Sequence, residues 1–283
     1  VDPRLIISCS GRRDSHKPFG EMVSLDLNTG EQYLMPRLNE PENILFRPHG
    51  IYLDGELLYV ISHEKEPDYH PVLVYRVDGR QLHFVEEIFT DRQHSPNALV
   101  TGPSGEIHLV NDSGKRGNLW EKALKLKRAS VEKLKKNSDG SWEAETMATG
   151  LGYPAGINRI GDQLFVGDAV LHCIHPYMIT PEGLLPTGKI KGLKGNDNIR
   201  IYEGQLLVPG HVKPLKFIKH AKNPEKPSPV DVFLADPETG EHTVLYSTKG
   251  ETISGGSTAI IFGKKLYISQ VFDPWILKVE LNP

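Results

Sequence analysis

The sequence predicts an all-β fold, a six-bladed β-propeller, from three observations. One short phrase of aliphatic residues framed by polar ones occurs six times along the 283 residues. Another short apolar stretch precedes five of these copies. Turn sequences that contain glycine end the apolar stretches that come after these copies. Repeated units of about 40–60 residues, each with four antiparallel strands, are typical of propeller blades.

The repeated phrase marks the second strand of each unit. It covers residues 3–9, 56–62, 106–111, 163–168, 205–210 and 265–270. The first strands ahead of it begin at His49, Asn97, Ala155, Asp197 and Ser257. Third strands are expected at residues such as 22–27, 72–77 and 230–235, and a fourth strand at residues 81–85. A two-sheet sandwich is the alternative, but it would not produce six copies of one four-strand unit.

The units at the two ends of the sequence are incomplete. The first unit starts at Val1 with its second strand, and the sixth unit stops after its third strand, residues 275–281. Closure of the ring removes exposed strand edges, so we expect both missing strands to come from residues ahead of Val1. Two strands of typical size correspond to roughly 20–30 residues. We expect residues 1–283 to form a single domain.

Two basic segments interrupt the β pattern. Residues 118–126 have apolar side chains at helical spacing, which predicts a short helix inserted in blade 3. The surrounding residues 115–136 carry nine Lys or Arg and two Glu. They indicate a solvated face or, alternatively, a lid or a peripheral contact with an anionic surface. Residues 213–226 are expected to form a basic, proline-containing loop at the equivalent position of blade 5.

Composition excludes several classes of protein. No run of about 18 apolar residues exists, so no transmembrane segment is expected. The net charge of −3 argues against a nucleic acid partner. The start at Val1 instead of Met favours a processed N-terminus, which is compatible with a secreted or periplasmic protein. Cys9 and Cys173 are too few for a disulfide framework, and we interpret them as buried free thiols, with a disulfide bridge as the alternative.

Two histidines frame one predicted hairpin, residues 49–63. An Asp54-Gly55 turn would carry His49 and His63 to the same end of the strand pair. Two imidazoles at one rim suit proton transfer near neutral pH. The alternative interpretation is a pair of ordinary surface histidines.

The starting residues of the innermost strands should meet at one end of the propeller axis. Several of them carry oxygen in a short side chain, namely Asn97, Asp197, Asn198 and Ser257. Such side chains favour a hard cation, above all calcium. The alternative is that they only cap the strand entrances through turn hydrogen bonds. The residues alone leave both interpretations open.

The chain resembles the paraoxonase/arylesterase family of six-bladed propeller lactonases. It is similar, more distantly, to gluconolactonases and strictosidine-synthase-like proteins. The resemblance covers nearly the whole chain and rests on Arg47-Pro48-His49-Gly50-Ile51, Ser62-His63, Ser95-Pro96-Asn97, His108-Leu109-Val110-Asn111-Asp112, Ala155-Gly156-Ile157-Asn158, Asp197-Asn198-Ile199, Gly256-Ser257-Thr258 and Val271-Phe272, in that order.

The resemblance implies a hydrolase of lactones or of aryl and carboxylic esters, with a small-molecule substrate. It implies that His49 and His63 activate water and that Asp112 is a pocket carboxylate. It further implies an axial catalytic calcium ion, held by Asn97, Asp197 and Asn198, that polarises the carbonyl. Substrate contacts are expected from Asn111, Tyr153 and Phe272.

Two alanines depart from the pattern of the family. Ala98 stands where the family has an Asp that binds a second, structural calcium ion. Ala155 stands where the family has an Asn that binds the catalytic ion, and the family's acidic pair of ligands would lie ahead of Val1. Fewer ligands weaken calcium binding. The alternatives are therefore a non-catalytic binding or interaction module with a degenerate metal site, or a metal-independent enzyme of the strictosidine-synthase-like type.

Overall fold

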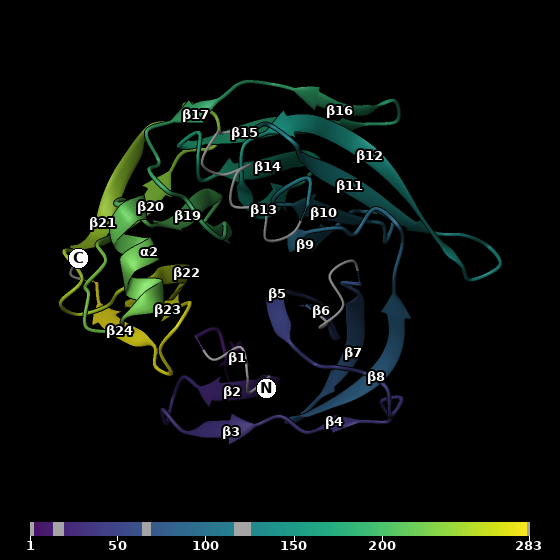
Figure 1. Ribbon diagram of the computed structural model, residues 1–283, viewed down its shortest axis with the longest axis horizontal. Helices are drawn as coiled ribbons and strands as arrows, with labels where there is room; N and C mark the ends of the chain where they lie inside the picture. The colour runs from purple at the N-terminus through teal and green to yellow at the C-terminus, as the bar shows by residue number, and fades with distance from the viewer. Residues whose placement is uncertain (1–2, 14–19, 64–68, 116–125, 282–283) are drawn as a thin grey trace. The chain divides into compact units, whose positions relative to one another are not determined.

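The computed structural model describes residues 3–13, 20–63, 69–115 and 126–281 (Figure 1). Within these ranges the strands form six sheets, which confirms the predicted fold class of a six-bladed β-propeller. None of the helices in the described ranges is both long and apolar enough to cross a bilayer.

That residues 1–283 form a single domain stays a prediction. The chain divides into two compact units, Val1–Leu109 with Glu132–Glu145 and Val110–Val131 with Thr146–Pro283.

Two sheets lie entirely within the first unit. One has the order β1-β2-β3, and the other has the order β4-β8-β7-β6-β5. The strands are β1 (Arg4–Ser10), β2 (Gly20–Asp26), β3 (Gln32–Leu34), β4 (Arg37–Leu38), β5 (Pro48–Asp54), β6 (Leu57–Ser62), β7 (Val72–Asp78) and β8 (Gln81–Ile88). Consecutive strands pair antiparallel, whereas β4 lies parallel to β8. This short parallel strand was not predicted.

The third sheet has the order β12-β11-β10-β9. Its strands are β9 (Pro96–Thr101), β10 (Ile107–Asn111), β11 (Ala129–Lys136) and β12 (Trp142–Leu151). Every residue of β9 and β10 is buried. A strand that is buried on both faces lacks the usual alternation of apolar and polar residues. This explains the continuous apolar character of the repeated phrase in the sequence.

The second unit contains three more sheets. Their orders are β13-β14-β15-β16 with β17 beside β15, then β18-β19-β20-β21, and finally β22-β23-β24. The strands are β13 (Pro154–Ile160), β14 (Gln163–Asp168), β15 (Cys173–Thr180), β16 (Gly183–Pro186), β17 (Ile190–Lys191), β18 (Arg200–Tyr202), β19 (Gln205–Gly210), β20 (Val230–Ala235), β21 (His242–Thr248), β22 (Gly256–Phe262), β23 (Lys265–Gln270) and β24 (Leu277–Glu280).

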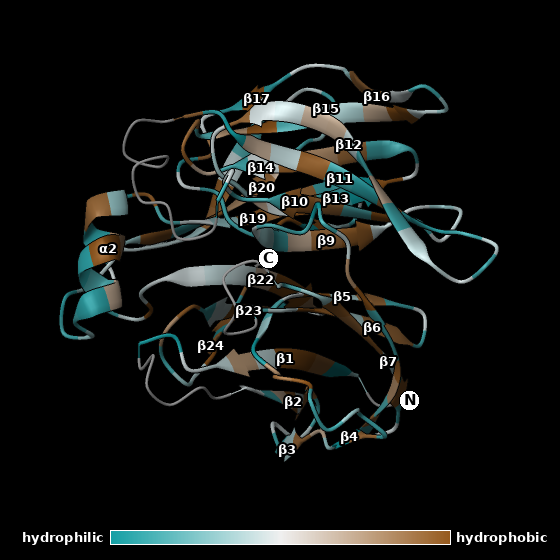
Figure 2. Cartoon of the chain, turned by 45° about the vertical axis from the view of Figure 1, so that its right-hand side comes forward, coloured by the Kyte–Doolittle hydropathy of each residue, from teal (hydrophilic) through white to brown (hydrophobic). Residues whose placement is uncertain are grey.

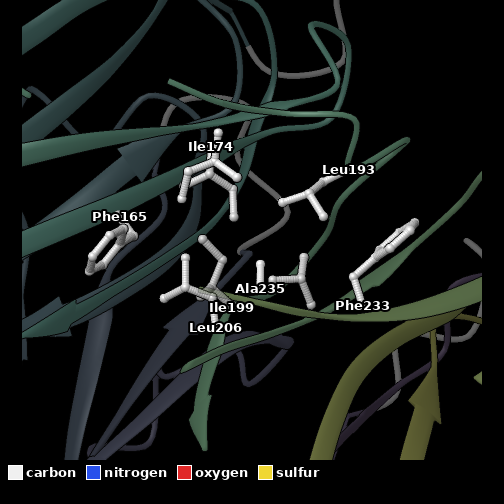
Figure 3. Close-up of a cluster of buried hydrophobic side chains, with 9 residues drawn as sticks. Phe165, Ile174, Leu193, Ile199, Leu206, Phe233 and Ala235 are labelled. Carbon is white, nitrogen blue, oxygen red and sulfur yellow. The ribbon is translucent and has the colours of Figure 1, made fainter. Parts of the chain in front are cut away.

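Apolar clusters between neighbouring sheets make the core. Figure 3 shows one of them, in which side chains of β14 and β15 meet those of β19 and β20. Its labelled members are Phe165, Ile174, Leu193, Ile199, Leu206, Phe233 and Ala235. Burial of one such large side chain stabilises the fold by about 1.5–3 kcal/mol. The sheets are therefore held together mainly by apolar contacts between their faces.

The structure corrects two sequence predictions in blade 5. Asp197 does not begin a strand, because β18 starts only at Arg200. Residues 213–226 are not simply a loop, since Pro214–Lys222 forms helix α2, and Pro214 suits the first turn, where no amide donor is needed. The predicted helix at residues 118–126 falls almost entirely outside the described residues. Cys9 and Cys173 are free thiols, as predicted, but only Cys173 is buried, whereas Cys9 is half-buried.

Glycine at the strand entrances allows backbones of neighbouring sheets to approach closely. A Cβ atom on Gly50 would lie 2.3 Å from the carbonyl oxygen of Asn97. A Cβ atom on Gly156 would lie 2.3 Å from the carbonyl oxygen of Asp197. No side chain tolerates such distances, so these positions require glycine. The entrances of β5 and β13 are therefore packed directly against the backbone of Asn97 on β9 and of Asp197 ahead of β18.

We expect Gly156→Ala to lower the free energy of unfolding by about 1–3 kcal/mol, because the new methyl group collides with backbone that cannot move away easily. Urea denaturation measures this change. Gly188→Ala is the matched control, since the described residues leave open space around Gly188. Its stability should stay close to that of the wild type. Equal effects of the two substitutions would contradict the close approach.

Candidate functional site

His49 and His63 lie together in the first unit. Strands β5 and β6 pair Pro48 with Ser62 and Ile51 with Val60, so His49 and Gly50 both lie opposite one residue in a β-bulge. A bulge turns a side chain away from the regular alternation. The two ring centroids lie 4.5 Å apart, with a tilt of 60° between the rings. The hairpin predicted from the sequence thus brings both imidazoles to one place, whereas their catalytic role stays a prediction.

A third imidazole, His70, extends this pair and was not predicted. Its ring centroid lies 5.1 Å from that of His63, and the rings are nearly perpendicular at 86°. The residue is 1% exposed, and Gln93 Nε2 donates a hydrogen bond of 3.1 Å to its carbonyl oxygen. The antiparallel register of β6 and β7 contained a signal for this third histidine. Ile61 pairs with Val72, and two further steps place His70 opposite His63.

Hydrogen bonds fix the backbone around the imidazoles. Ser62 Oγ donates to the carbonyl oxygen of Leu45 at 2.8 Å and accepts from the amide of Arg47 at 2.9 Å. The amide of His63 donates to the carbonyl oxygen of Arg47 at 2.9 Å. From β1, Ser8 Oγ donates to the carbonyl oxygen of His49 at 3.1 Å. These bonds fix the backbone that carries His49 and His63. A fixed backbone keeps catalytic side chains in position during a reaction.

Asn97, a predicted calcium ligand, also lies in the first unit. It is the second residue of β9, is 7% exposed, and has its carbonyl oxygen against Gly50. Ala98 beside it is buried at 5% exposure. The position that the resemblance assigns to a ligand of the structural calcium ion is therefore a buried methyl group, which cannot bind a cation.

Asp197 and Asn198 lie in the second unit, where the backbone runs between two strands. The amide of Asp197 donates to the carbonyl oxygen of Pro209 on β19 at 2.9 Å. The amide of Asn198 donates to the carbonyl oxygen of Ser257 on β22 at 3.2 Å. The side chain Nδ2 of Asn198 also donates to Ser257, at 3.1 Å to both its carbonyl oxygen and its hydroxyl. Bonds to both sides replace the strand pairing predicted for these residues.

His211 pairs with Asp197 and was missed by the sequence analysis. Its Nε2 lies 3.1 Å from Asp197 Oδ2, and both side chains are only slightly exposed. His211 directly follows β19, as His63 directly follows β6. The repeat itself therefore contained the signal, because residues at equivalent positions of different blades follow the same strand end.

An aromatic cluster borders the Asp197–His211 pair. Phe217 on α2 stacks on His211 with ring centroids 3.9 Å apart. The ring centroid of Phe217 also lies 5.3 Å from that of Phe272, a residue that is predicted to contact the substrate. Gly255 lies beneath these rings, with Phe217 and Phe272 each close to the position of a Cβ atom. In this unit the imidazole that pairs with Asp197 thus also stacks on an apolar ring.

The remaining predicted pocket residues take part in local hydrogen bonds. Asn111 is fully buried, and its Nδ2 donates to Ser130 Oγ at 3.3 Å. Asp112 is 7% exposed, and its Oδ1 accepts from Ser113 Oγ at 2.7 Å. Tyr153 is half-buried. The catalytic role of Asp112 and the substrate contacts of Asn111 and Tyr153 stay predictions.

A buried carboxylate holds the loop that carries Tyr153. Asp168 accepts hydrogen bonds from the amides of Gly152 at 2.7 Å, Leu171 at 3.0 Å and Tyr153 at 3.1 Å. Burial opposes ionisation of Asp168, but His175 and these amides outweigh it and lower the pKa of the carboxyl group.

The partner of Asp168, His175, has a strongly shifted pKa. Burial disfavours the charged ring, but two neighbours of its Nε2 favour it. They are Asp168 Oδ2 at 3.7 Å and Cys173 Sγ at 3.4 Å. These neighbours outweigh burial and raise the pKa of His175 to about 9. The ring is therefore charged at neutral pH and stabilises the ionised form of Asp168.

This pKa shift predicts a loss of stability at alkaline pH. An unfolded histidine has a pKa near 6.5, so the contribution of His175 is complete below that value and disappears as the pH rises to about 9. The unfolding free energy of the wild type should fall across this range. His175→Gln should lack that part of the fall, whereas the exposed control His242→Gln should retain it. Equal slopes in wild type and His175→Gln would contradict the assignment.

Comparison with known proteins identifies relatives over almost the whole chain. A family model described as Arylesterase matches residues 19–279. Serum paraoxonase/arylesterase 2 of Bos taurus is 25% identical over 272 residues, which cover 90% of this chain and 75% of that protein. Serum paraoxonase/arylesterase 1 of Rattus norvegicus is 24% identical over 279 residues, which cover 92% and 76%.

Solved structures with the same fold include proteins described as lactonases. The periplasmic gluconolactonase of Pseudomonas aeruginosa has a TM-score of 0.54 at 13% identity, with 94% of this chain and 88% of that chain covered. A putative 6-phosphogluconolactonase from Bacteroides uniformis has a TM-score of 0.56 at 11% identity, with 95% and 90% covered. At such low identity these structures show the fold alone.

Proposed function

The chain belongs to the arylesterase family of carboxylic ester hydrolases, and from this premise we propose that it hydrolyses lactones or aryl and carboxylic esters. The observation that carries the proposal is the close pair of imidazoles, His49 and His63, with ring centroids 4.5 Å apart. Histidine is the side chain best suited to proton transfer near neutral pH. Hydrolysis of an ester needs one proton taken from water and one given to the leaving group.

The proposed reaction uses the imidazole pair as an acid–base catalyst. His49 is the more exposed of the two, and it is the proposed base, with His63 as its inner neighbour. As the water oxygen bonds to the carbonyl carbon, the neutral imidazole takes the proton of the water. The tetrahedral intermediate then expels an alkoxide or phenolate, which takes the proton from the imidazolium. The imidazole returns to its neutral form.

The proposed metal ligands have the chemistry that calcium requires. Asp197 offers a carboxylate, and Asn198 offers an amide oxygen that points away from Ser257, since its amide nitrogen bonds that residue. We propose these two oxygens as calcium ligands and keep Asn97 as the third from the family resemblance. Calcium, when bound, would polarise the carbonyl of the substrate. The described residues contain no cluster of three or more His, Cys, Asp or Glu side chains that could hold a metal.

Ala98 limits the metal proposal to one ion, because it replaces a ligand of the structural ion, whereas Ala155 replaces a ligand of the catalytic ion. Both are buried, at 5% and 4% exposure, and offer no side-chain oxygen. They are also the observation that favours the alternative function, a propeller that binds ligands without catalysis. Asp112 is proposed as a pocket carboxylate, and Asn111, Tyr153 and Phe272 as contacts of the bound small-molecule substrate.

We expect His49→Gln and His63→Gln each to lower kcat/KM for a lactone or aryl ester about 100-fold or more, because general acid–base catalysis supplies about 10²–10⁴-fold. Glutamine keeps hydrogen-bonding capacity but cannot take the proton. The exposed His242, on β21, provides the control, and His242→Gln should hydrolyse as the wild type does. Full activity in both site variants would rule out the imidazole pair, and inactivity of the wild type on every ester and lactone would favour the binding module.

We expect chelation of calcium to reduce hydrolysis and added calcium to restore it. Asp197→Asn should weaken the restoration, because loss of a charged ligand lowers calcium affinity. Initial rates at increasing free calcium measure the apparent affinity in both proteins. Hydrolysis that is unaffected by a chelator would exclude the metal and favour a metal-independent enzyme.

A further inference from the structure

His63 is the middle member of a row of three imidazoles. The strands β5, β6 and β7 are neighbours in one sheet, and Figure 2 shows them side by side, with hydrophobic residues along them in brown. His49 lies on β5, His63 follows β6, and His70 comes two residues ahead of β7. The ring of His63 therefore has an imidazole on each side, with ring centroids at 4.5 Å for His49 and 5.1 Å for His70.

The three rings are buried more deeply from one end of the row to the other. His49 is half-buried, His63 is 8% exposed, and His70 is 1% exposed. Water and a substrate therefore reach the row from the side of His49, and His70 forms its inner end. Because so buried a side chain does not contact a substrate, any part that His70 takes in hydrolysis must act through His63.

Hydrogen bonds hold the backbone of His70 from two sides. The amide of Ser62 donates to the carbonyl oxygen of Pro71 at 2.9 Å, so the pairing of β6 with β7 continues up to the neighbour of His70. Gln93 is also 1% exposed, and its Nε2 donates to the carbonyl oxygens of His70 at 3.1 Å and of Ile88 at 3.2 Å. This buried glutamine ties His70 to the end of β8, so the inner ring is attached to a fixed backbone.

The contact between His63 and His70 has the geometry of an edge-to-face aromatic pair. The two rings are inclined by 86°, and their centroid distance of 5.1 Å lies in the range typical of such pairs. The edge of one ring then points at the face of the other, an arrangement that electrostatic attraction between edge and face favours. Rotation of the His63 ring would break this contact, so the contact opposes rotation.

We propose that His70 is a positioning residue that holds the ring of His63 in the orientation required beside His49. This role rests on the proposed function, in which His49 and His63 form the acid–base pair. Proton transfer requires the reacting groups at hydrogen-bonding distance, and a small displacement lowers the rate strongly. His63 thus has His49 on the side of the reaction and His70 as a fixed support on the other side.

Two substitutions that both fill the buried space test the role of the His70 ring. His70→Phe keeps an aromatic ring against His63, whereas His70→Leu keeps an apolar side chain without a ring. We expect His70→Leu to lower kcat for a lactone or aryl ester about tenfold or more and to leave KM nearly unchanged, because His70 does not contact the substrate. His70→Phe should keep kcat within about threefold of the wild type.

Leu82→Ala is the control for a general loss of packing in the same sheet. Leu82 is fully buried on β8 and pairs with Val77, at the opposite end of this strand from Ile88. Its loss should lower the free energy of unfolding and leave kcat/KM unchanged. Thermal unfolding of every variant shows whether it is folded at the assay temperature. If His70→Leu does not fold, His70→Met replaces it, because methionine adapts to irregular spaces.

A second readout follows the His63 ring itself and needs no activity. A ring in one orientation keeps each nitrogen beside the same neighbours, which favours one tautomer. The ring nitrogens of ¹⁵N-labelled histidine then give well-separated NMR signals, and His63→Gln identifies those of His63 by their loss. At about pH 8, where an ordinary imidazole is neutral, the signals should be separated in the wild type, His70→Phe and Leu82→Ala. They should move toward each other in His70→Leu.

Kinetics and NMR together separate failure of this role from failure of the proposed function. Inactivity of the wild type on every ester and lactone would contradict the proposed function, and the ring signals would still decide whether His70 fixes His63. Three results would overturn the role of His70: unchanged His63 signals in His70→Leu, unchanged kcat in that variant, or an equal loss of kcat in His70→Phe. The last result would indicate that the nitrogens of His70, and not its ring contact, affect the reaction.

Discussion

The close approach of backbones at the strand entrances is the constraint on which the candidate site depends. Gly50 lies against the carbonyl oxygen of Asn97, and Gly156 lies against that of Asp197. In each case a strand begins against the backbone of a polar residue of the predicted site, Asn97 on β9 or Asp197 ahead of β18. A side chain at either glycine would push that polar residue away. The two glycines thus allow the backbones of Asn97 and Asp197 to lie where they do, independently of any side-chain hydrogen bond.

Hydrogen bonds also hold the backbone around the candidate residues. The amides of Asp197 and Asn198 bond to strands on both sides, and the Asn198 side chain bonds to Ser257. In the first unit the bonds of Ser62 and Ser8 have the same effect on His49 and His63. Polar groups buried in this way must find partners. The scaffold thus satisfies these backbone groups within the fold.

Helix α2 connects this scaffold to the surface. Its inner side contributes Phe217 to the ring cluster beside His211, and the pair of His220 and Asp273 anchors it. Its outer side holds exposed Leu215 and Ile218 among lysines. One side of the helix therefore packs against the protein and the opposite side contacts the solvent.

Repetition made the fold class and many strands readable from the sequence. Six copies of one apolar phrase predicted the blades, and the Asp54-Gly55 turn predicted the hairpin that joins His49 to His63. His70 and His211 were not predicted, although strand register and the blade repeat contained a signal for them, because only the tertiary structure shows the side-chain contacts that pair them with His63 and Asp197. It also decided that Asp197 and Asn198 lie outside β18, since hydrogen bonds to neighbouring strands replace their own pairing. Local patterns determine periodic elements, whereas contacts between distant residues depend on how those elements pack.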